Sequence, residues 1–413
     1  MNSRPGRYVA GELPPGRRVA QLRARRGMTQ QIFANRIGKS KSWVDKVERG
    51  LRNLDRFSTI ETVAEVLGVT PEILLSKAAR WPEPTGPTAE ALERVRAALV
   101  GFDTTSTAGR PGPLPADELT RRVNHAWEAY RHAHHPQVLR MLPDLLHDAR
   151  HLTTTSQADT TNTLIRVYRL AAQVLVKLDE PELAWLVADR AMTTAAGDPR
   201  HTAMAAIPLT QALRALNRGR LAMTAATTAV QPLALTPSRP APLDHLALVG
   251  ILHVQAALAA ATCDDPTAVR HHTRQADHLA AAHRDHPDHD GGGDLDFVPV
   301  MVDLARALTA AELGDSQHAI TLHRQATSGD AWRRLPAEHR AAHLIDISRA
   351  YLDLGDHRAA GQALVTADQI APAETRTRPA AHTALTTLLR TGPTTADVTR
   401  LATTMSTANQ ISP

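Results

Sequence analysis

Lysine is rare in this chain, and most of it is clustered in one short stretch. The sequence has five Lys against 42 Arg, and three of the five are Lys39, Lys41 and Lys46. A helix at this place would put Lys41, Ser42 and Lys46 on one face. Lys ammonium groups donate hydrogen bonds to guanine O6 and N7 in the DNA major groove. The spacing therefore favours a helix that reads bases, and the alternative is chance clustering on a solvated face.

Residues 28–50 have the pattern of two short helices joined by a tight turn. Thr29 and Ser40 are N-cap residue types, and Gly38 and Gly50 stand where helices often end at positive φ. The apolar residues expected to face one another across the turn are Phe33, Ala34, Ile37, Val44 and Val47. Two helices that cross over such a turn form a helix-turn-helix, whose second helix enters the major groove.

The sequence TQxxxAxxxGxSxSxVxxxERG over residues 29–50 resembles the XRE (Cro/lambda-repressor-like) helix-turn-helix of bacterial regulators. The resemblance covers about residues 13–77 and implies five helices. The first begins at Pro14 or Pro15, the fourth carries Ile60 to Leu67, and a short fifth helix begins at Thr70. The alternative is two ordinary amphipathic helices in an α-helical protein.

The resemblance also implies which residues contact DNA. Bases would be read by the second helix of the motif, Gln30 would bond a phosphate at a helix N-terminus, and Trp43 would either contact a base or pack. The predicted DNA-binding set is Gln30, Lys39, Lys41, Ser42, Trp43, Lys46, Arg52, Asn53 and Arg56. Arg23 and Glu48 occupy the positions of a buried ion pair, which is a structural role.

The charge of the chain is divided between a basic head and a mildly acidic body. The net charge is +5, but residues 1–80 hold 16 Lys and Arg against 7 Asp and Glu, giving +9. The remainder holds 31 against 35, giving −4. This division is typical of a DNA-binding domain attached to another domain.

Composition predicts an all-α protein of two or more domains. The chain has 413 residues, enough for more than one core, and aromatic residues make up only 3%. An Ala- and Leu-rich sequence with few β-branched runs favours helices. The one cysteine, Cys263, allows no disulfide within the chain, fits a reducing compartment, and is expected to be a small buried hydrophobe.

The segments expected to be apolar do not indicate a membrane protein. The N-terminus carries Arg4 and Arg7 but no apolar core segment of a signal peptide. The most apolar run, Leu246 to Cys263, is borderline in length for a membrane span and contains His253 and Gln255. We interpret it as a buried helix and expect a soluble, cytoplasmic protein.

We predict four segments along the chain. Residues 1–12 form a flexible arm, and residues 13–80 form the five-helix lambda-repressor-like domain. Residues 81–115 are a linker that contains one helix, from Thr88 to about Gly101, between breakers rich in Pro and Gly. Residues 116–413 form a helical repeat domain.

An internal repeat supports the last assignment. Gly314-Asp315 is followed by Ala319 and Ala326, and Gly355-Asp356 is followed by Ala360 and Ala367. Two alanines seven residues apart on one helix face let a neighbouring helix approach closely, which resembles the tetratricopeptide (TPR) helix pair. The irregular spacing predicts about six degenerate pairs stacked in a TPR-like α-solenoid. The alternative is a generic α-helical bundle.

The whole layout resembles actinomycete XRE regulators with a long TPR-like C-terminal region. The stretches behind this resemblance are Leu183-Ala184-Trp185, Gly250-Ile251-Leu252-His253, Phe297-Val298-Pro299 and Glu338-His339-Arg340 through Tyr351. Val298 departs from the family's pattern, which has glycine there.

In a TPR stack the first helix of each pair lines the concave surface, and here that surface is expected to be cationic. The candidate effector-binding residues are Arg166, Arg169, Gln173, Lys177, Gln211, Arg214 and Arg349. Such a set suits an anionic effector, such as a peptide carboxylate, an acidic protein segment or a phosphorylated metabolite. The alternative is that these residues form structural ion pairs and bind nothing.

Other residues that could carry chemistry point to neither a metal site nor an enzyme. The His/Asp-rich residues 283–290 and the pair His147 and His151 could contribute metal ligands, but a solvated loop and exposed polar residues are the preferred interpretations. There is no paired-carboxylate frame, no G-x-S-x-G and no phosphate loop. We expect no catalytic residues, no metal and no cofactor.

The sequence hypothesis is a transcriptional regulator that responds to a ligand or a partner. It is expected to be a homodimer that binds a roughly palindromic double-stranded DNA operator. One alternative is an antitoxin whose C-terminal body masks a toxin and whose head represses its own operon. The other is an interaction scaffold that has lost DNA binding.

Overall fold

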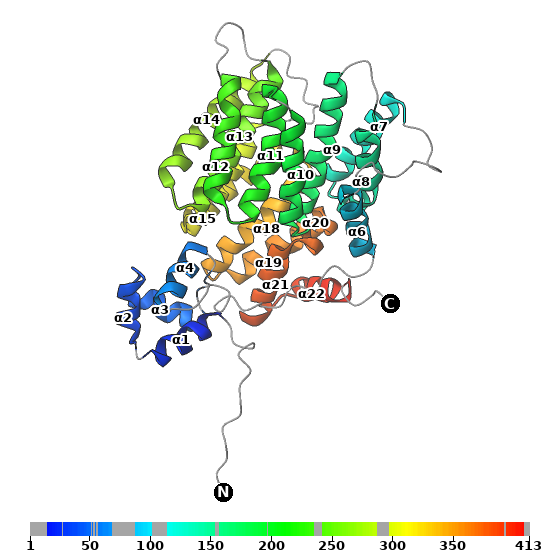
Figure 1. Ribbon diagram of the computed structural model, residues 1–413. Coiled ribbons are helices and arrows are strands. Elements are labelled where there is room, and N and C mark those ends of the chain that lie inside the picture. Colours follow the sequence, from blue (N-terminus) through cyan, green and yellow to red (C-terminus); the bar gives the residue numbers. More distant parts are fainter. Residues whose placement is uncertain are drawn as a thin grey trace. The chain divides into compact units, whose positions relative to one another are not determined.

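The computed structural model describes residues 15–26, 28–50, 52, 54, 57–67, 87–100, 114–152, 157–195, 197–234, 242–286, 297–391 and 394–408. Every regular element within these ranges is a helix (Figure 1), so the all-α prediction is confirmed. The chain divides into two compact units, Met1–Glu83 and Pro84–Pro413. Each unit is described by itself below.

The N-terminal unit contains four described helices around one core. They are α1 (Pro15–Arg25), α2 (Gln30–Arg36), α3 (Lys41–Glu48) and α4 (Phe57–Val66). Fully buried core side chains include Phe33, Val44, Val63 and Leu67. The predicted arm and the predicted fifth helix at Thr70 lie outside the described residues.

Helix α1 packs tightly against the end of α3. A methyl group added at Gly16 would overlap the backbone carbonyl oxygen of Val47. Because that obstacle is backbone, it cannot rotate away as a flexible side chain would. Glycine at position 16 therefore sets how closely α1 approaches α3.

The second unit begins with α6 (Pro87–Val100) and continues as a succession of helices. These are α7 (Ala116–Arg131), α8 (His135–Arg150), α9 (Gln157–Lys177), α10 (Pro181–Ala195), α11 (Pro199–Ala215), α12 (Gly219–Ala234), α13 (Leu243–Thr262), α14 (Pro266–Arg284), α15 (Pro299–Glu312), α16 (Ser316–Thr327), α17 (Asp330–Arg334), α18 (Ala337–Asp353), α19 (His357–Ile370), α20 (Pro372–Thr377), α21 (Pro379–Thr391) and α22 (Ala396–Ala408).

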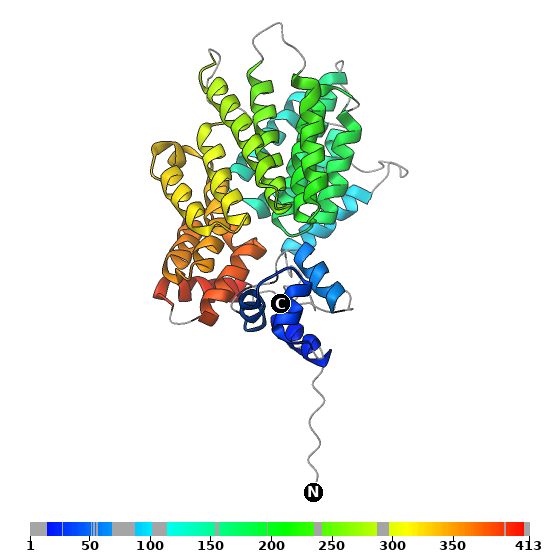
Figure 2. The ribbon, with the colours of Figure 1, turned by 90° about the vertical axis from the view of Figure 1, so that its left-hand side faces the viewer.

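The long helices pair along the chain, and the first helices of successive pairs stack on one another. The pairs are α7/α8, α9/α10, α11/α12, α13/α14, α15/α16 and α18/α19, with α21/α22 following. The contacts α7–α9, α9–α11, α11–α13, α13–α15 and α15–α18 join the first helices. In Figure 2 the helices coloured from green to yellow stand side by side in this stack. This is the helical-repeat architecture predicted from the alanine pattern.

Each pair turns through a residue at positive φ. These residues are Ala133, Asp179, Asn217, Asp264, Gly314 and Gly355, with φ between 57° and 87°. In three of the pairs an aspartate then caps the second helix; for example, Asp356 Oδ1 accepts a hydrogen bond from the backbone N–H of Ala359 at 3.0 Å. The turn geometry thus repeats even where the sequence carries no glycine.

Helix α6 belongs to the core of the second unit. The sequence had placed it in a linker, but Leu92, Val95 and Leu99 are buried in the same cluster as residues of α7 and α8. Its apolar residues face a partner, which a linker helix in solvent would lack. The linker prediction for residues 87–100 is therefore corrected.

Helix α13 is long and apolar enough to be a candidate membrane span by length and composition, the one such helix among the described residues. It packs against α11, α12, α14 and α15, and 61% of its apolar window is buried within the protein. These contacts are those of the buried helix that the sequence predicted.

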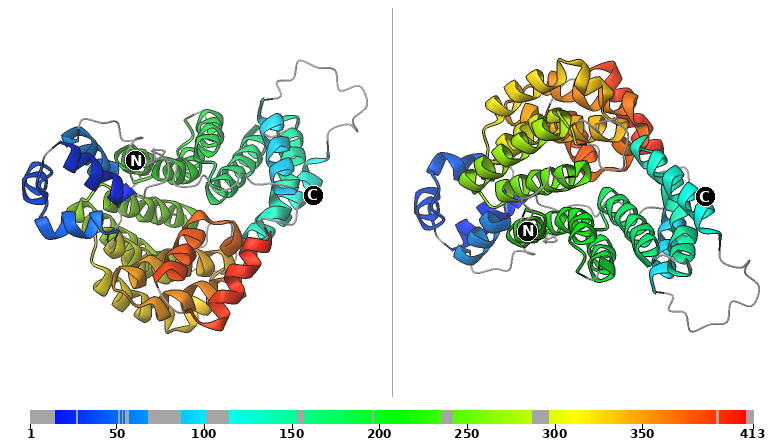
Figure 3. Two further views of the ribbon diagram at one scale, coloured as in Figure 1. Left: turned by 90° about the horizontal axis from the view of Figure 1, so that it is seen from below. Right: turned by 90° about the horizontal axis from the view of Figure 1, so that it is seen from above.

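The repeats curve so far that the first pair meets the last helices. Figure 3 views the unit along its axis, with the cyan helices beside the orange and red ones. Contacts between α7 and α18 and between α8 and α20 close this circuit. Ala133, in the turn after α7, is buried in the same cluster as Tyr351 of α18 and Ala381 of α21. The stack is therefore closed between its two ends, which an open solenoid is not.

Candidate functional site

The two helices of the predicted helix-turn-helix are fixed at their ends by local hydrogen bonds. The Thr29 hydroxyl caps α2 by accepting from the backbone N–H of Ile32 at 3.2 Å, and the Ser40 hydroxyl caps α3 by accepting from Trp43 N–H at 3.1 Å. Gly38, at φ +65°, occupies the turn between the helices. These caps begin α3 at Lys41, so Lys41 and Ser42 lie in its first turn and Lys46 lies in its second.

Helix α3 has a buried face and an exposed face. Val44 and Val47 are almost fully buried in the core of the N-terminal unit. Lys41, Ser42 and Lys46 are exposed on the other side. Lys39, just before the helix, is exposed as well. Within the described part of the chain, these three lysines have no carboxylate at ion-pair distance.

Trp43 lies at the border of the two faces. It is partly buried against the core of the unit. The guanidinium of Arg52 lies over its ring, 6.0 Å from the ring centroid. This contact holds an exposed cation next to α3. Asn53 and Arg56, predicted to hold the DNA backbone, lie outside the described residues.

Arg23 and Glu48 form a bidentate ion pair between α1 and the end of α3. Arg23 Nε donates to Glu48 Oε1 at 2.5 Å, and Nη2 donates to Oε2 at 3.0 Å. The side chains are 15% and 7% exposed. Arg23 Nη1 also donates to the Met28 carbonyl at 2.6 Å. The hydrogen bond to Glu48 raises the pKa of Arg23. The pair therefore joins the start of the motif to its end.

Gln30 contacts the same carboxylate. Its Nε2 donates to Glu48 Oε2 at 2.9 Å, and its side chain is partly buried. A Gln amide nitrogen has two hydrogens, so this bond leaves one donor for another acceptor. The predicted bond from Gln30 to a phosphate stays a prediction.

The seven candidate effector-binding residues lie on α9, α11 and α18, which are first helices of their pairs. Arg166 Nη2 donates to Asn124 Oδ1 at 2.8 Å, and Arg214 Nη1 donates to Gln255 Oε1 at 3.2 Å. Arg349 is half-exposed, with Glu312 at 3.6 Å. Gln173 and Gln211 are partly buried.

Two members of this set differ from the expectation of an open cationic surface. Arg169 is only 2% exposed, and its guanidinium lies 5.2 Å from the centroid of the Trp127 ring. Lys177 is 14% exposed and forms ion pairs with Glu338 and Glu374. Lys177 is covered because the repeats curve back on themselves, whereas Arg169 lies against α7 of the neighbouring pair. The contacts of both side chains are those of structural residues.

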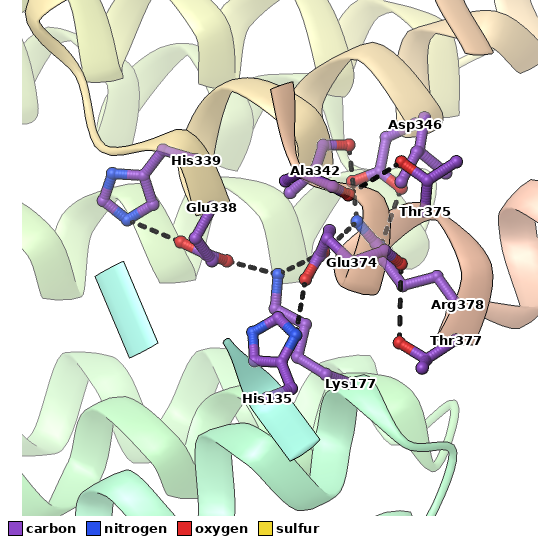
Figure 4. A network of polar contacts seen from close by, with 12 residues as sticks. His135, Lys177, Glu338, His339, Ala342, Asp346, Glu374, Thr375, Thr377 and Arg378 are labelled. Atoms are coloured by element: carbon purple, nitrogen blue, oxygen red, sulfur yellow. Dashed lines mark hydrogen bonds and ion pairs between the residues drawn. The ribbon is translucent and has the colours of Figure 1, made fainter. Parts of the chain in front are cut away.

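Lys177 lies at the centre of a buried polar network (Figure 4). Its ammonium donates to Glu374 Oε1 at 2.7 Å and to Glu338 Oε1. Glu338 is 5% exposed, and Glu374 is fully buried. Burial raises the pKa of Glu338, but the charges of Lys177 and, next in size, His339 lower it by more than burial raises it. The net result is a pKa of about 2.

Arg378 and His135 complete this network. Arg378 Nη2 donates to Asp346 at 2.8 Å, and Nη1 lies 3.4 Å from Glu374 Oε1. His135 Nδ1 lies 3.4 Å from Glu374 Oε2 with both side chains fully buried, and burial lowers the pKa of His135. We call Lys177, Arg378, His135, Glu338, Asp346 and Glu374 the ionic clasp. It joins α8 and α9 to α18 and α20.

Two histidine pairs, one partly buried and one buried, were also not foreseen. His253 Nδ1 lies 3.0 Å from His272 Nδ1, and His323 Nδ1 lies 2.9 Å from His343 Nε2. Burial lowers the pKa of His343 to about 3 and that of His323 to about 4. Each pair bridges two helices, and the only sequence signal is a histidine on each helix.

Two stretches that resembled family motifs meet in the core. A methyl group at Gly250 would overlap the ring of Phe297, which is fully buried. The Phe297 ring also has an edge contact with His283. Gly250 and Phe297 therefore pack α13 against the start of α15.

The structure describes some of the candidate metal ligands. Residues 287–290 lie outside the described ranges, and the rings of His147 and His151 contact each other at 4.3 Å between centroids. Among the described side chains, no group of three or more His, Cys, Asp or Glu could hold a metal ion.

Comparison with known proteins identifies the N-terminal unit. Residues 16–75 match a family described as a helix-turn-helix domain. This match confirms the helix-turn-helix predicted from the sequence. No curated protein matches the chain. Among solved structures, a crystal structure of PlcR from Bacillus thuringiensis in complex with the peptide PapR7 and DNA is similar at 10% sequence identity. The similarity covers 76% of this chain and 92% of that chain, with a TM-score of 0.35.

Proposed function

We propose that this protein is a sequence-specific DNA-binding transcriptional regulator of the cytoplasm. Its helix-turn-helix unit binds an operator, and its helical-repeat unit dimerises and senses an effector. The observation that carries the proposal is the exposed face of α3, where Lys41, Ser42 and Lys46 have no carboxylate partner among the described residues. Such a face is free to meet the edges of bases.

Residues in the first two turns of α3 read the bases. Lys41 and Lys46 donate to guanine, and Ser42 donates to or accepts from any base that it reaches. Lys39 and Arg52 flank the helix and neutralise phosphates, which makes binding weaken as salt rises. Trp43 orients Arg52 through the ring contact already described.

The ion pair between Arg23 and Glu48 keeps α3 at a fixed angle to α1. Gln30 bonds Glu48 with one amide hydrogen and offers the other to a phosphate. The buried carboxylate thus links a phosphate contact at the start of α2 to the end of the recognition helix. Asn53 and Arg56 are proposed to hold the DNA backbone beyond α3.

Effector sensing belongs to the first helices of the repeats. Arg166, Gln211, Arg214 and Arg349 supply the polar groups of the proposed surface, with Gln173 beside them on α9. Arg169 and Lys177 have structural roles, through the Trp127 ring and the Glu338 carboxylate. An anionic effector fits this composition because the guanidinium fork pairs bidentately with carboxylate or phosphate. No catalytic step is proposed.

The experiment that tests the function is genome-wide mapping of binding sites for the full-length protein, followed by gel-shift titration of the best sites. Binding at specific palindromic sites that is lost in Lys41→Ala/Lys46→Ala supports the proposal. Arg358→Ala, an exposed substitution in the second unit, is the control. Absence of site-specific binding would favour the scaffold, and binding confined to its own operon beside a toxin gene would favour the antitoxin.

A further inference from the structure

A groove with a volume of about 710 Å³ lies within the second unit between α14, α15 and α16. It is bordered by the first half of α14, the second half of α15 and the first half of α16. Its floor is formed by Val269, Thr309, Ala310, Leu313 and Leu322. The volume lies within the roughly 300–1,000 Å³ that is typical of ligand-binding sites.

The groove is separate from the proposed effector surface. Helices α14 and α16 are the second helices of their pairs, whereas the effector candidates lie on first helices. Helix α14 packs much more extensively on α13 than on α15. Part of α15 is therefore left to line the groove between α14 and α16.

The lining of the groove is basic. It includes Arg270, Arg274, Arg306 and His318 and contains no Asp or Glu. Arg306 forms ion pairs with Asp277 and, at 2.8 Å, with Asp303, so its charge is compensated. Among the described residues, the arginines of the lining with no carboxylate at ion-pair distance are therefore Arg270 and Arg274 of α14.

Arg270 and Arg274 make only local contacts among the described residues. Arg270 Nη2 donates to Thr267 Oγ1 at 3.1 Å, and Arg274 Nε donates to the carbonyl of Arg270 at 3.3 Å. Both are exposed and lie one turn apart on the same helix. Like charges at this spacing repel, so a bound anion would relieve an existing repulsion.

We propose that this groove binds an acidic amphipathic segment of a partner protein. Carboxylates of the segment pair with Arg270 and Arg274, and its apolar side chains rest on Val269, Leu313 and Leu322. A small amphipathic acid suits the groove less well, because the exposed walls cannot enclose most of its surface. A helical segment needs only one covered face, and the two flanking helices offer a groove for it. This interaction goes beyond DNA binding and effector sensing.

The test uses the full-length protein and a fluorescein-labelled helical peptide with leucine on one face and glutamate on the other. Fluorescence anisotropy should show saturable binding to the wild type. Arg270→Glu/Arg274→Glu should weaken binding by at least about tenfold and should bind a matched lysine-for-glutamate peptide better than the wild type does. Arg358→Glu, which reverses the charge of one exposed arginine early in α19, is the control for charge reversal outside the groove and should bind as the wild type.

Three outcomes would overturn the proposal. The first is no saturable binding of the glutamate peptide to the wild type, including the case in which dodecanoate binds in its place. The second is equal affinity of wild type and double variant, with folding verified by circular dichroism. The third is equal binding of a peptide whose leucines are replaced by serine, because the floor would then contribute nothing. All three are independent of operator binding.

Discussion

Replacing Lys177 with methionine removes the cation at the centre of the ionic clasp. Methionine approximates the length of the lysine stem but carries no charge. Glu374 then retains Arg378 at 3.4 Å, whereas the ion-pair partner that Glu338 retains among the described residues is His339, at 3.3 Å. Both carboxylates are buried, so Glu338 in particular becomes a poorly compensated charge.

The magnitude follows from the pKa of Glu338, which is lowered from 4.5 to about 2 in the folded protein. At about 1.4 kcal/mol for each pH unit, that difference corresponds to about 3 kcal/mol of stability. Breaking a buried ion pair costs a similar ~3–5 kcal/mol. A carboxyl whose pKa is depressed on folding stabilises the protein above its unfolded-state pKa. This contribution is lost as the pH falls from 4.5 toward 2.

We expect Lys177→Met to destabilise the second unit by about 3 kcal/mol at pH 7, and the difference from wild type to shrink between pH 4.5 and pH 2. Urea unfolding of the full-length protein, followed by far-ultraviolet circular dichroism, measures both effects. Arg121→Met is the control, because Arg121 is 71% exposed beside Glu118 and should cost less than about 1 kcal/mol. Equal stability of Lys177→Met and wild type at pH 7 would refute the reasoning.

Other variants test the recognition unit and the histidine pairs. Lys46→Ala should weaken operator binding by roughly 1–3 kcal/mol and relax specificity at one base. If its relative affinities for base-substituted operators equal those of the wild type, Lys46 does not read a base. Arg23→Ala should destabilise the N-terminal unit by about 3–5 kcal/mol because Glu48 loses its cation; unchanged hydrogen exchange in α3 would contradict this. Gly16→Ala should cost about 1–3 kcal/mol by forcing α1 away from α3, seen as a lower urea midpoint. His343→Phe should flatten the loss of stability that wild type shows as pH falls from about 6.5 toward 3, since a buried neutral His must charge; an unchanged pH profile would exclude it as a source.

The N-terminal unit was largely predictable because its signals are local. Thr29 and Ser40 cap the helices within three residues, and Gly38 has the positive φ that its residue type favours. The bond from Gln30 to Glu48 was not foreseen, because a side-chain amide has several possible partners and sequence spacing does not rank them.

The repeats were harder to delimit because their turns vary in residue type. Gly314 and Gly355 marked two turns, whereas Ala133 and Asn217 adopt the same positive φ without a glycine. The second helices could still be recognised from alanines such as Ala360, since close packing demands a small residue there.

The ionic clasp could not be predicted from sequence. Lys177 lies 161 residues before Glu338 and 197 residues before Glu374. Small rotations at every repeat decide whether these residues meet, and no local pattern encodes their sum. The sequence placed Lys177 on an open surface and did not predict its carboxylate partners.

Closure of the repeat stack has a consequence for how the protein is made. Domains generally fold in the order in which they emerge from the ribosome. Helix α9 is synthesised with Lys177 long before α18 and α20 supply its carboxylate partners. In the nascent chain, the early repeats therefore expose a hydrophobic face and Lys177 before its carboxylate partners have been synthesised. A chain that ends before residue 374 lacks the Glu374 carboxylate and cannot complete the ionic clasp. A premature stop codon near the C-terminus should therefore destabilise the whole second unit and not its final helices alone.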